Sequence, residues 1–177
     1  EYGLASRSGS MYLVTDVVDG TTWADAALDE ANKLGVIEKL TDAVEHLHGL
    51  GISHGDLHPC NVMVARESGN VYLIDIPDFS HNTAESKNHR YSPENIDGSS
   101  SEQRDIFAVL RMSCELLGLE WGEESNAYPR ISEVVQSELN DLDFGFRDLG
   151  RFKKALTSAA EVGEQKVVEI LLNGIDE

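Results

Sequence analysis

The stretch His54-Gly-Asp-Leu-His-Pro-Cys-Asn61 decides the fold, because it joins a helical pattern to a strand pattern. Before it, apolar residues recur at steps of three and four over residues 31–50, which predicts an amphipathic helix. After it, the apolar segments 61–64 and 71–74 are separated by Ser68-Gly-Asn70, which is typical of a β-hairpin. The sequence therefore predicts a polar, proline-containing loop between a helix and a hairpin.

Three oxygen-bearing side chains, Asp56, Asn61 and Asp75, are predicted to converge at one end of this hairpin. Asp56 and Asn61 lie five positions apart in the loop, and Asp75 ends the second strand. Phosphoryl transfer needs a carboxylate that orients the attacking hydroxyl and oxygen ligands that hold Mg²⁺ against the phosphates. Magnesium prefers hard oxygen ligands, usually one or two carboxylates completed by phosphate and water. The pattern therefore favours one Mg-nucleotide site at these three residues.

Helical patterns account for most of the remaining chain. Ser99 followed by Glu102 can form a capping box, and the helix that it opens is expected to stop at Gly118. The apolar run 11–15 suits a strand, and residues 16–20 are typical of a turn or linker. This order predicts an α+β domain that is mainly α-helical. Shorter helical patterns follow at residues 131–139, 152–160 and 166–172.

The composition limits the classes of partner. The 177 residues include 32 acidic and 14 basic side chains, for a formal net charge of −18. That field repels phosphodiester backbones and anionic lipids, so neither nucleic acid nor a membrane surface is an expected partner. No apolar run approaches the roughly 20 residues that span a bilayer. Cys60 and Cys114 are too few for a disulfide framework, which predicts reduced thiols and a cytoplasmic location.

The 54–61 stretch resembles the catalytic loop H-R-D-L-x-x-x-N of protein kinases. The resemblance implies that Asp56 is the catalytic base and that Asn61 is a magnesium ligand. Asp75 matches the Asp of the D-F-G element, the second magnesium ligand. His54 would be a structural residue that braces the loop by hydrogen bonds. The implied fold is the C-terminal lobe of a protein kinase, with its magnesium ligands on the short hairpin and with ATP and Mg²⁺ as cofactors.

Three further segments extend the resemblance in chain order. Ser92-Pro-Glu94 is similar to the A-P-E that closes the activation segment, which implies a structural role for Glu94. Arg104-Asp105-Ile-Phe resembles the start of a buried helix whose Asp braces the catalytic loop. The run from Tyr12 to Gly20 looks like the hinge. By this resemblance the residues that face adenine are Thr15, as the gatekeeper, and the backbone of Asp16 and Val18.

The resemblance also divides the chain. It implies the last strand of the N-terminal lobe and the hinge at residues 1–20, the kinase-like C-terminal lobe at 21–160, and a C-terminal helical extension at 161–177. The Gly-rich loop, the strand lysine and the helical Glu of the family have no counterpart in these residues. We therefore expect an N-terminal lobe to be supplied in cis or in trans, and this chain alone to have little phosphotransfer activity.

Departures from the family pattern leave three functions open. The first expectation is ATP-dependent phosphorylation of Ser/Thr hydroxyls on a protein substrate. Gly55 replaces the Arg of H-R-D, and Ile76-Pro77 replaces the Phe-Gly of D-F-G, which favours a pseudokinase or docking module without catalysis. His58 stands where Ser/Thr kinases usually place Lys, and an imidazole there can donate to a phosphate oxygen during catalysis. The loop with His58 also resembles aminoglycoside phosphotransferases, which favours a small-molecule substrate.

Overall fold

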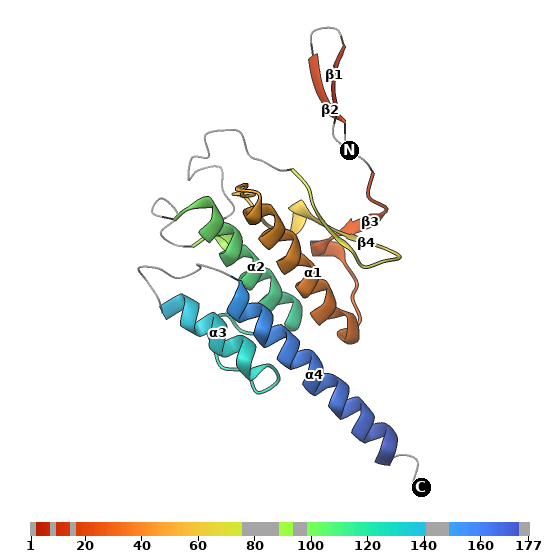
Figure 1. Ribbon diagram of the computed structural model, residues 1–177, viewed down its shortest axis with the longest axis vertical. Coiled ribbons are helices and arrows are strands. Elements are labelled where there is room, and N and C mark those ends of the chain that lie inside the picture. Colours follow the sequence, from red (N-terminus) through yellow and green to blue (C-terminus); the bar gives the residue numbers. More distant parts are fainter. Residues whose placement is uncertain are drawn as a thin grey trace.

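The computed structural model describes residues 3–7, 10–14, 17–75, 89–93, 99–140 and 149–173. This part of the chain is mainly helical with small antiparallel sheets, in agreement with the predicted α+β class. Figure 1 shows α1 beside α2, with α4 packed along α1 and α3. In chain order the elements are β1 (Gly3–Arg7), β2 (Ser10–Val14), β3 (Gly20–Thr22), η1 (Trp23–Asp25), α1 (Glu30–Gly49), η2 (Pro59–Asn61), β4 (Val62–Ala65), β5 (Val71–Leu73), η4 (His89–Tyr91), α2 (Ser101–Leu117), α3 (Pro129–Asn140) and α4 (Gly150–Asn173).

Helix α1 confirms the helix predicted over residues 31–50. Asp29 precedes its first turn, and the chain leaves the helix through Gly51, which has a left-handed φ of 72°. Its buried stripe follows the predicted steps of three and four, so one face of the helix packs into the core. The buried residues of α1 are Val36, Ile37, Leu40, Thr41 and Val44.

Helix α2 lies at the centre of the fold and ends where the sequence predicts. Gly118 follows its last residue with a left-handed φ of 66°, and its N–H bonds back to the Glu115 carbonyl. The capping box is one residue later than predicted: Ser100 and Gln103 form it, rather than Ser99 and Glu102. Gln103 can reach the Ser100 N–H, so the amide takes the place expected for the carboxylate.

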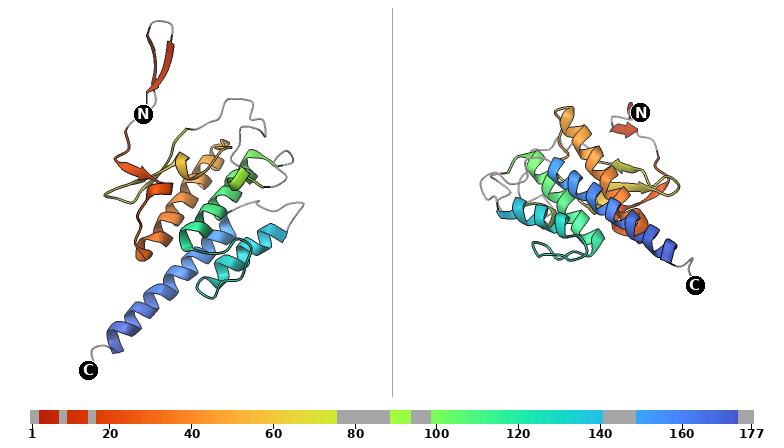
Figure 2. Two further views of the ribbon diagram at one scale, coloured as in Figure 1. Left: turned by 180° about the vertical axis from the view of Figure 1, so that it is seen from behind. Right: turned by 60° about the horizontal axis from the view of Figure 1, so that its bottom comes forward.

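The two predicted helices 152–160 and 166–172 are one helix, α4. The prediction of two separate helices was wrong because Gly163, between them, weakens a helix without ending it. Lys153 near its start bonds to Asp42 and Glu45 of α1, each at 2.7 Å, and these hydrogen bonds raise the pKa of Lys153. Figure 2 shows the C-terminal half of α4 extending past the other helices. No helix in the described ranges is long and apolar enough to cross a membrane.

The predicted hairpin is confirmed as β4 and β5, with Val62 opposite Leu73 and Val64 opposite Val71. Strand β3, which pairs with β4, was not predicted, because residues 16–20 were interpreted as a turn or linker. Gly20 permits this pairing: a Cβ there would lie 2.2 Å from the Val64 carbonyl oxygen. The predicted strand 11–15 is confirmed as β2, which pairs with β1 in a separate sheet.

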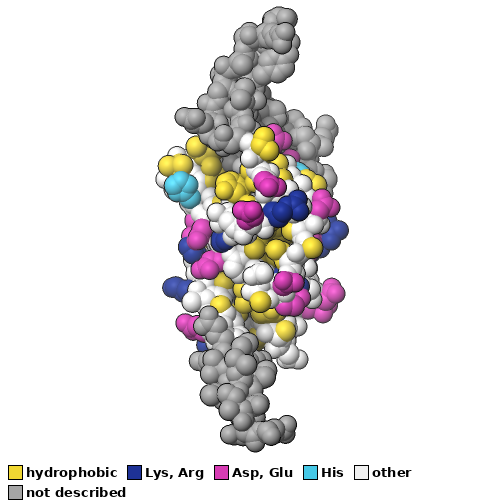
Figure 3. Space-filling model, turned by 90° about the vertical axis from the view of Figure 1, so that its right-hand side faces the viewer, with side chains coloured by type: hydrophobic (Ala, Val, Ile, Leu, Met, Phe, Trp, Pro, Cys, Tyr) yellow, Lys and Arg dark blue, Asp and Glu magenta, His cyan; other side chains and the backbone are white. Residues whose placement is uncertain are grey.

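The core lies between the four helices and the inner face of β4. Trp23 is buried in it and Trp121 packs edge-on against Phe107, so both tryptophans are packing residues. Both cysteines are free, and burial raises the pKa of the Cys114 thiol to about 12. On the face that Figure 3 draws, acidic side chains are scattered among the described residues.

Candidate functional site

The 54–61 loop is anchored to α2 by one buried carboxylate. Asp105, the fifth residue of α2, has no exposed surface. Its Oδ1 accepts the N–H of Gly55 at 2.7 Å, and its Oδ2 accepts the N–H of His54 at 2.7 Å. His48 of α1 lies beside Oδ2 with its Nε2 at 3.0 Å. Three donors therefore satisfy Asp105, and the start of the loop cannot move independently of α1 and α2.

His54 joins the loop to the end of the hairpin. Its side chain is 1% exposed, and its Nε2 donates to the carbonyl of Ile74 at 3.0 Å. This bond places the ring proton on Nε2. Its Nδ1 is buried and has no hydrogen-bond partner within the part of the chain that the structure describes. Through its Nε2, His54 therefore links the loop to the residue that precedes Asp75.

Backbone pairing brings Asp56, Asn61 and Asp75 to the same end of β4 and β5. The N–H of Ile74 donates to the Asn61 carbonyl at 3.0 Å, so Asp75 directly follows the residue that pairs with Asn61. The Asn61 Nδ2 donates to the Asp56 carbonyl at 3.0 Å, which closes the loop on itself. Since Nδ2 is engaged there, the other side-chain atom of Asn61, the Oδ1 acceptor, is the one left for a cation.

Asp75 has an unusual backbone conformation. Its φ is 64°, and it is the only residue other than glycine with a positive φ in the described ranges. Asp adopts the left-handed region more readily than most residues, but the conformation still costs free energy. Such outliers concentrate at functional sites, where the surrounding structure holds them. The side chain of Asp75 is exposed at this point.

His58 has a structural contact that the sequence did not predict. Its Nδ1 accepts the N–H of Cys60 at 3.3 Å, which caps η2, and Pro59 occupies the first position of that short helix. The proton of a neutral His58 ring is therefore on Nε2, which is the nitrogen that could donate to a phosphate oxygen. A polar residue followed by Pro is the signal that could have identified this cap.

Three of the predicted site residues, Thr15, Asp16 and Glu94, lie outside the described residues. Val18 is described and partly buried. The segment close to Glu94 is anchored by a contact that sequence reasoning missed. Glu115 of α2 accepts from the Arg90 Nε at 2.9 Å and from the Tyr91 hydroxyl at 2.8 Å.

The outer face of the hairpin presents apolar side chains next to Asn61 and Asp75. Met63 and Tyr72 are paired across β4 and β5, so they lie on one face, opposite to the buried Val62 and Val64. Tyr72 is 43% exposed and Ile74 is 37% exposed. The strict alternation of the two strands could have identified this surface from sequence.

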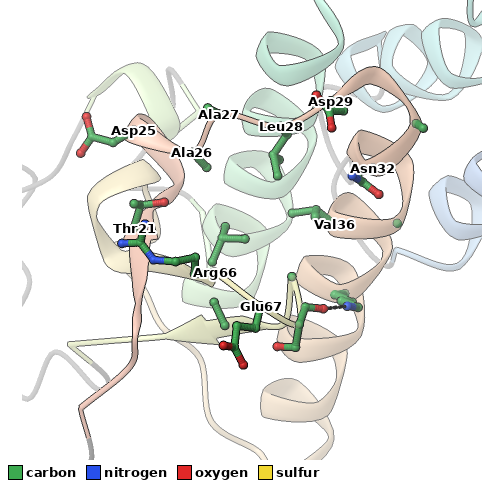
Figure 4. A pocket seen from close by; sticks show the side chains of 17 residues that line it. Thr21, Asp25, Ala26, Ala27, Leu28, Asp29, Asn32, Val36, Arg66 and Glu67 are labelled. Carbon is green, nitrogen blue, oxygen red and sulfur yellow. Dashed lines mark hydrogen bonds between the residues drawn. The ribbon is translucent and has the colours of Figure 1, made fainter.

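A cavity of about 500 Å³ lies at the opposite end of the hairpin (Figure 4). The first turns of α1, the segment around η1 and the β4–β5 turn form its walls. Leu28, Val36 and Val64 contribute apolar surface, and Asp29 and Glu67 contribute carboxylates. None of the described candidate residues lines it.

The donor set at Asn61 and Asp75 suits a partly hydrated cation. In the described ranges no group of three or more His, Cys, Asp or Glu side chains could hold a metal ion alone. One carboxylate, from Asp75, and one amide oxygen, from Asn61, fit Mg²⁺, which usually keeps water and phosphate among its ligands. The residues present therefore fit a magnesium ion that arrives together with phosphate oxygens.

Comparisons with known proteins give matches to kinases. A family model described as the lipopolysaccharide kinase (Kdo/WaaP) family matches residues 11–98. The matches support a protein-kinase-like chain. Serine/threonine-protein kinase Pkn1 of Myxococcus xanthus is 31% identical over 71 residues, which is 38% of this chain and 10% of that protein. Ribosomal protein S6 kinase alpha-3 of Homo sapiens is 36% identical over 74 residues, 39% of this chain and 10% of that kinase.

Protein GFS12 of Arabidopsis thaliana is 26% identical over 152 residues, which cover 71% of this protein-kinase-like chain. The alignment spans 9% of that protein. The chain thus spans about a tenth of the length of the curated relatives that it matches.

Proposed function

We propose that this chain supplies the catalytic residues of an ATP-dependent phosphotransferase. The observation that carries the proposal is the meeting of the 54–61 loop with the end of the hairpin. There the Asn61 side chain bonds to the Asp56 carbonyl, and Asp75 follows the backbone pair of Asn61 and Ile74. The match of residues 11–98 to a kinase family model and the similarity to serine/threonine-protein kinase Pkn1 support it.

Asp56 would act as the general base in this proposal. Its carboxylate would accept the proton of the acceptor hydroxyl while that oxygen bonds to the γ-phosphorus and the bond to the β–γ bridging oxygen breaks. Asn61 Oδ1 and the Asp75 carboxylate would hold Mg²⁺. When bound, that ion neutralises charge on the phosphate oxygens. His58 Nε2 could donate to an oxygen of the transferred group.

The nucleotide base would lie against the outer face of the hairpin. Tyr72 and Ile74 offer exposed apolar surface there, beside the partly buried Met63 and next to the two proposed magnesium ligands. Stacking and apolar contact would bind the base, while the end of the hairpin would bind the phosphates. Thr15, Asp16 and Val18 remain the proposed hinge contacts.

For the acceptor, a protein Ser/Thr hydroxyl is the first proposal, supported by the similarity to serine/threonine-protein kinase Pkn1. A saccharide hydroxyl is the second, supported by the match to a lipopolysaccharide kinase family and by His58 in the loop. Both acceptors are alcohols, so the same base serves either one.

The test uses intact protein with Mg-ATP carrying a labelled γ-phosphate. We expect label on protein or on added lipopolysaccharide or aminoglycoside, and a loss of about 10²–10⁴-fold in Asp56→Asn and Asp75→Ala. Glu67→Gln, an exposed change at the other end of the hairpin, serves as the matched control and should keep its activity. Label on protein alone supports the first acceptor, and label on saccharide alone supports the second. Equal labelling by wild type and both variants, or no labelling of any acceptor, would contradict the proposal and favour a docking module.

A further inference from the structure

Gly55 stands directly before the proposed base and has a backbone that favours glycine. Its φ is 78°, a left-handed value that a side chain would strain. An arginine at this position, as in the kinase pattern, would have to adopt that conformation. With glycine here, the loop can adopt the left-handed conformation, but it has no arginine side chain of its own at this position.

Two consecutive residues of α2 hold both peptide groups of Gly55. Asp105 Oδ1 accepts the Gly55 N–H at 2.7 Å. Arg104 Nε donates to the Gly55 carbonyl at 3.4 Å. That carbonyl belongs to the peptide that continues into Asp56, so its orientation sets the direction in which the Asp56 backbone leaves the loop. The Asp105 carboxylate therefore holds the N–H of Gly55, and the Arg104 guanidinium holds its carbonyl.

The other contacts of Arg104 do not explain its position by charge pairing. Its Nη1 donates to the Ser99 carbonyl at 2.9 Å, and its Nη2 donates to the Ser101 hydroxyl at 2.7 Å. Within the described residues these partners are neutral oxygens, and no carboxylate pairs with the guanidinium. A cation in the first turn of a helix is also disfavoured by the helix dipole. Of its three contacts, the one to the Gly55 carbonyl is the one that leaves the start of the helix and reaches the loop.

We infer that Arg104 is a positioning residue for Asp56. Together, Asp105 and Arg104 form a clamp on Gly55, in which one holds its N–H and the other its carbonyl. Helix α2 thus brings an arginine to the loop, which has glycine where the kinase pattern has arginine. The guanidinium suits this role because its fork can hold the Ser99 and Ser101 oxygens with two nitrogens and the Gly55 carbonyl with the third. The inference rests on the proposed function, since it assigns Asp56 as the base.

The experiment compares Arg104→Ala and Arg104→Lys with Arg151→Ala in the intact protein. Arg151 is the matched control, because it too lies in the first turn of a helix and donates to a serine hydroxyl, that of Ser137, at 3.1 Å. We expect Arg104→Ala to lower kcat by about 10- to 100-fold with KM for Mg-ATP nearly unchanged, because a displaced base slows chemistry without weakening binding. Arg104→Lys should fall between, since an ammonium cannot hold three separate oxygens at once. Arg151→Ala should match wild type.

Amide hydrogen exchange at Asp56 provides a second measurement that needs no catalysis. Exchange there should be faster in both Arg104 variants and unchanged in Arg151→Ala. Equal exchange and equal kcat in Arg104→Ala and wild type would overturn the inference. If Arg104→Ala does not fold, Arg104→Lys decides by the same two readings. Faster exchange together with full activity in Asp56→Asn would overturn the proposed function instead, and would leave the clamp as a structural contact only.

Discussion

The two ends of the β4–β5 hairpin are built in opposite ways. At one end, the 54–61 loop and Asp75 are held by buried polar groups, among them the fully buried Asp105 and His54. At the other end, the turn at residues 66–69 borders the cavity, and its charged side chains are exposed to solvent (Figure 4).

The loop end therefore has a fixed backbone conformation, whereas the cavity end has space for a ligand. The loop end contains two left-handed residues, Gly55 and Asp75, whose conformations persist because buried hydrogen bonds surround them. The cavity end contains room for a ligand, and its cations bond at the surface: Lys39 donates to the Ser68 carbonyl at 2.9 Å, and Arg66 lies 3.6 Å from Asp19. Substitutions should therefore have effects that fall steeply from the loop end to the cavity end. We therefore assign the proposed chemistry to the first end.

Asp105→Ala should have the largest effect on stability. The change leaves the N–H groups of His54 and Gly55, and the ring N–H of His48, without their acceptor in a site closed to water. An unsatisfied buried donor costs about 1–3 kcal/mol, so we expect a loss of about 3 kcal/mol in the free energy of unfolding, measured by urea denaturation. Asp105→Asn keeps one acceptor and should lose less. A loss below about 1 kcal/mol in Asp105→Ala would show that the loop is held by other contacts.

Gly20→Ala and Gly35→Ala should shift stability in opposite directions. A Cβ on Gly20 would lie 2.2 Å from the Val64 carbonyl oxygen, so β3 must move away from β4, at a cost of about 1–3 kcal/mol. Gly35 lies inside α1 on the cavity wall, and a Cβ there would meet nothing within 4 Å. Alanine should therefore stabilise the helix by about 0.5–1 kcal/mol.

Thermal unfolding of the two glycine variants measures both signs. If Gly20→Ala is neutral, β3 is not fixed against β4, and the cavity wall that it forms is adjustable. If Gly35→Ala destabilises, the cavity is filled or closed in solution at that position. The two glycine variants therefore test, without any ligand, whether the cavity is open in solution.

The local patterns of the sequence predict the parts of the fold that depend on nearby residues. The stripe of α1, the hairpin turn and the left-handed Gly118 each follow from residues within one element. The single helix α4 and strand β3 could not be predicted in this way. Strand β3 depends on pairing with β4, more than forty positions later in the chain. Helix α4 continues through Gly163, although glycine has a low helix propensity.

For the site, residue types and spacing predicted the candidates Asp56, Asn61 and Asp75, and the backbone brings them to one end of the hairpin. The contacts of His48 and Arg104 could not be predicted, because they arise only where α1 and α2 approach the loop. His48 and Asp105 are 57 positions apart. Neither periodicity nor a motif in one segment contains the information about such a contact.

Glu115→Gln should have the smallest effect on stability, and it compares the two carboxylates of α2. Glu115 near the end of the helix is partly exposed and is shared by Arg90, Tyr91 and Arg111, whereas Asp105 at the start is buried. Solvent screens the ion pairs, so we expect a loss of about 1 kcal/mol or less. Burial first, and then the hydrogen bond and charge of Glu115, raise the pKa of Tyr91 to about 12. Glu115→Gln should lower this pKa, measured by the ultraviolet absorbance of tyrosinate.

The sign of the pH dependence follows from that raised pKa. The fold favours the protonated phenol of Tyr91, so its contribution to stability is complete below the ordinary tyrosine pKa of about 10 and is lost as the pH rises towards 12. Wild type should therefore lose more stability than Glu115→Gln between these two pH values. Equal losses would mean that burial alone sets the pKa, and that Glu115 does not hold Tyr91 against α2. In that case the partly exposed Glu115 would not fix the position of Tyr91, and of the two carboxylates only the buried Asp105 would hold a neighbouring segment against α2.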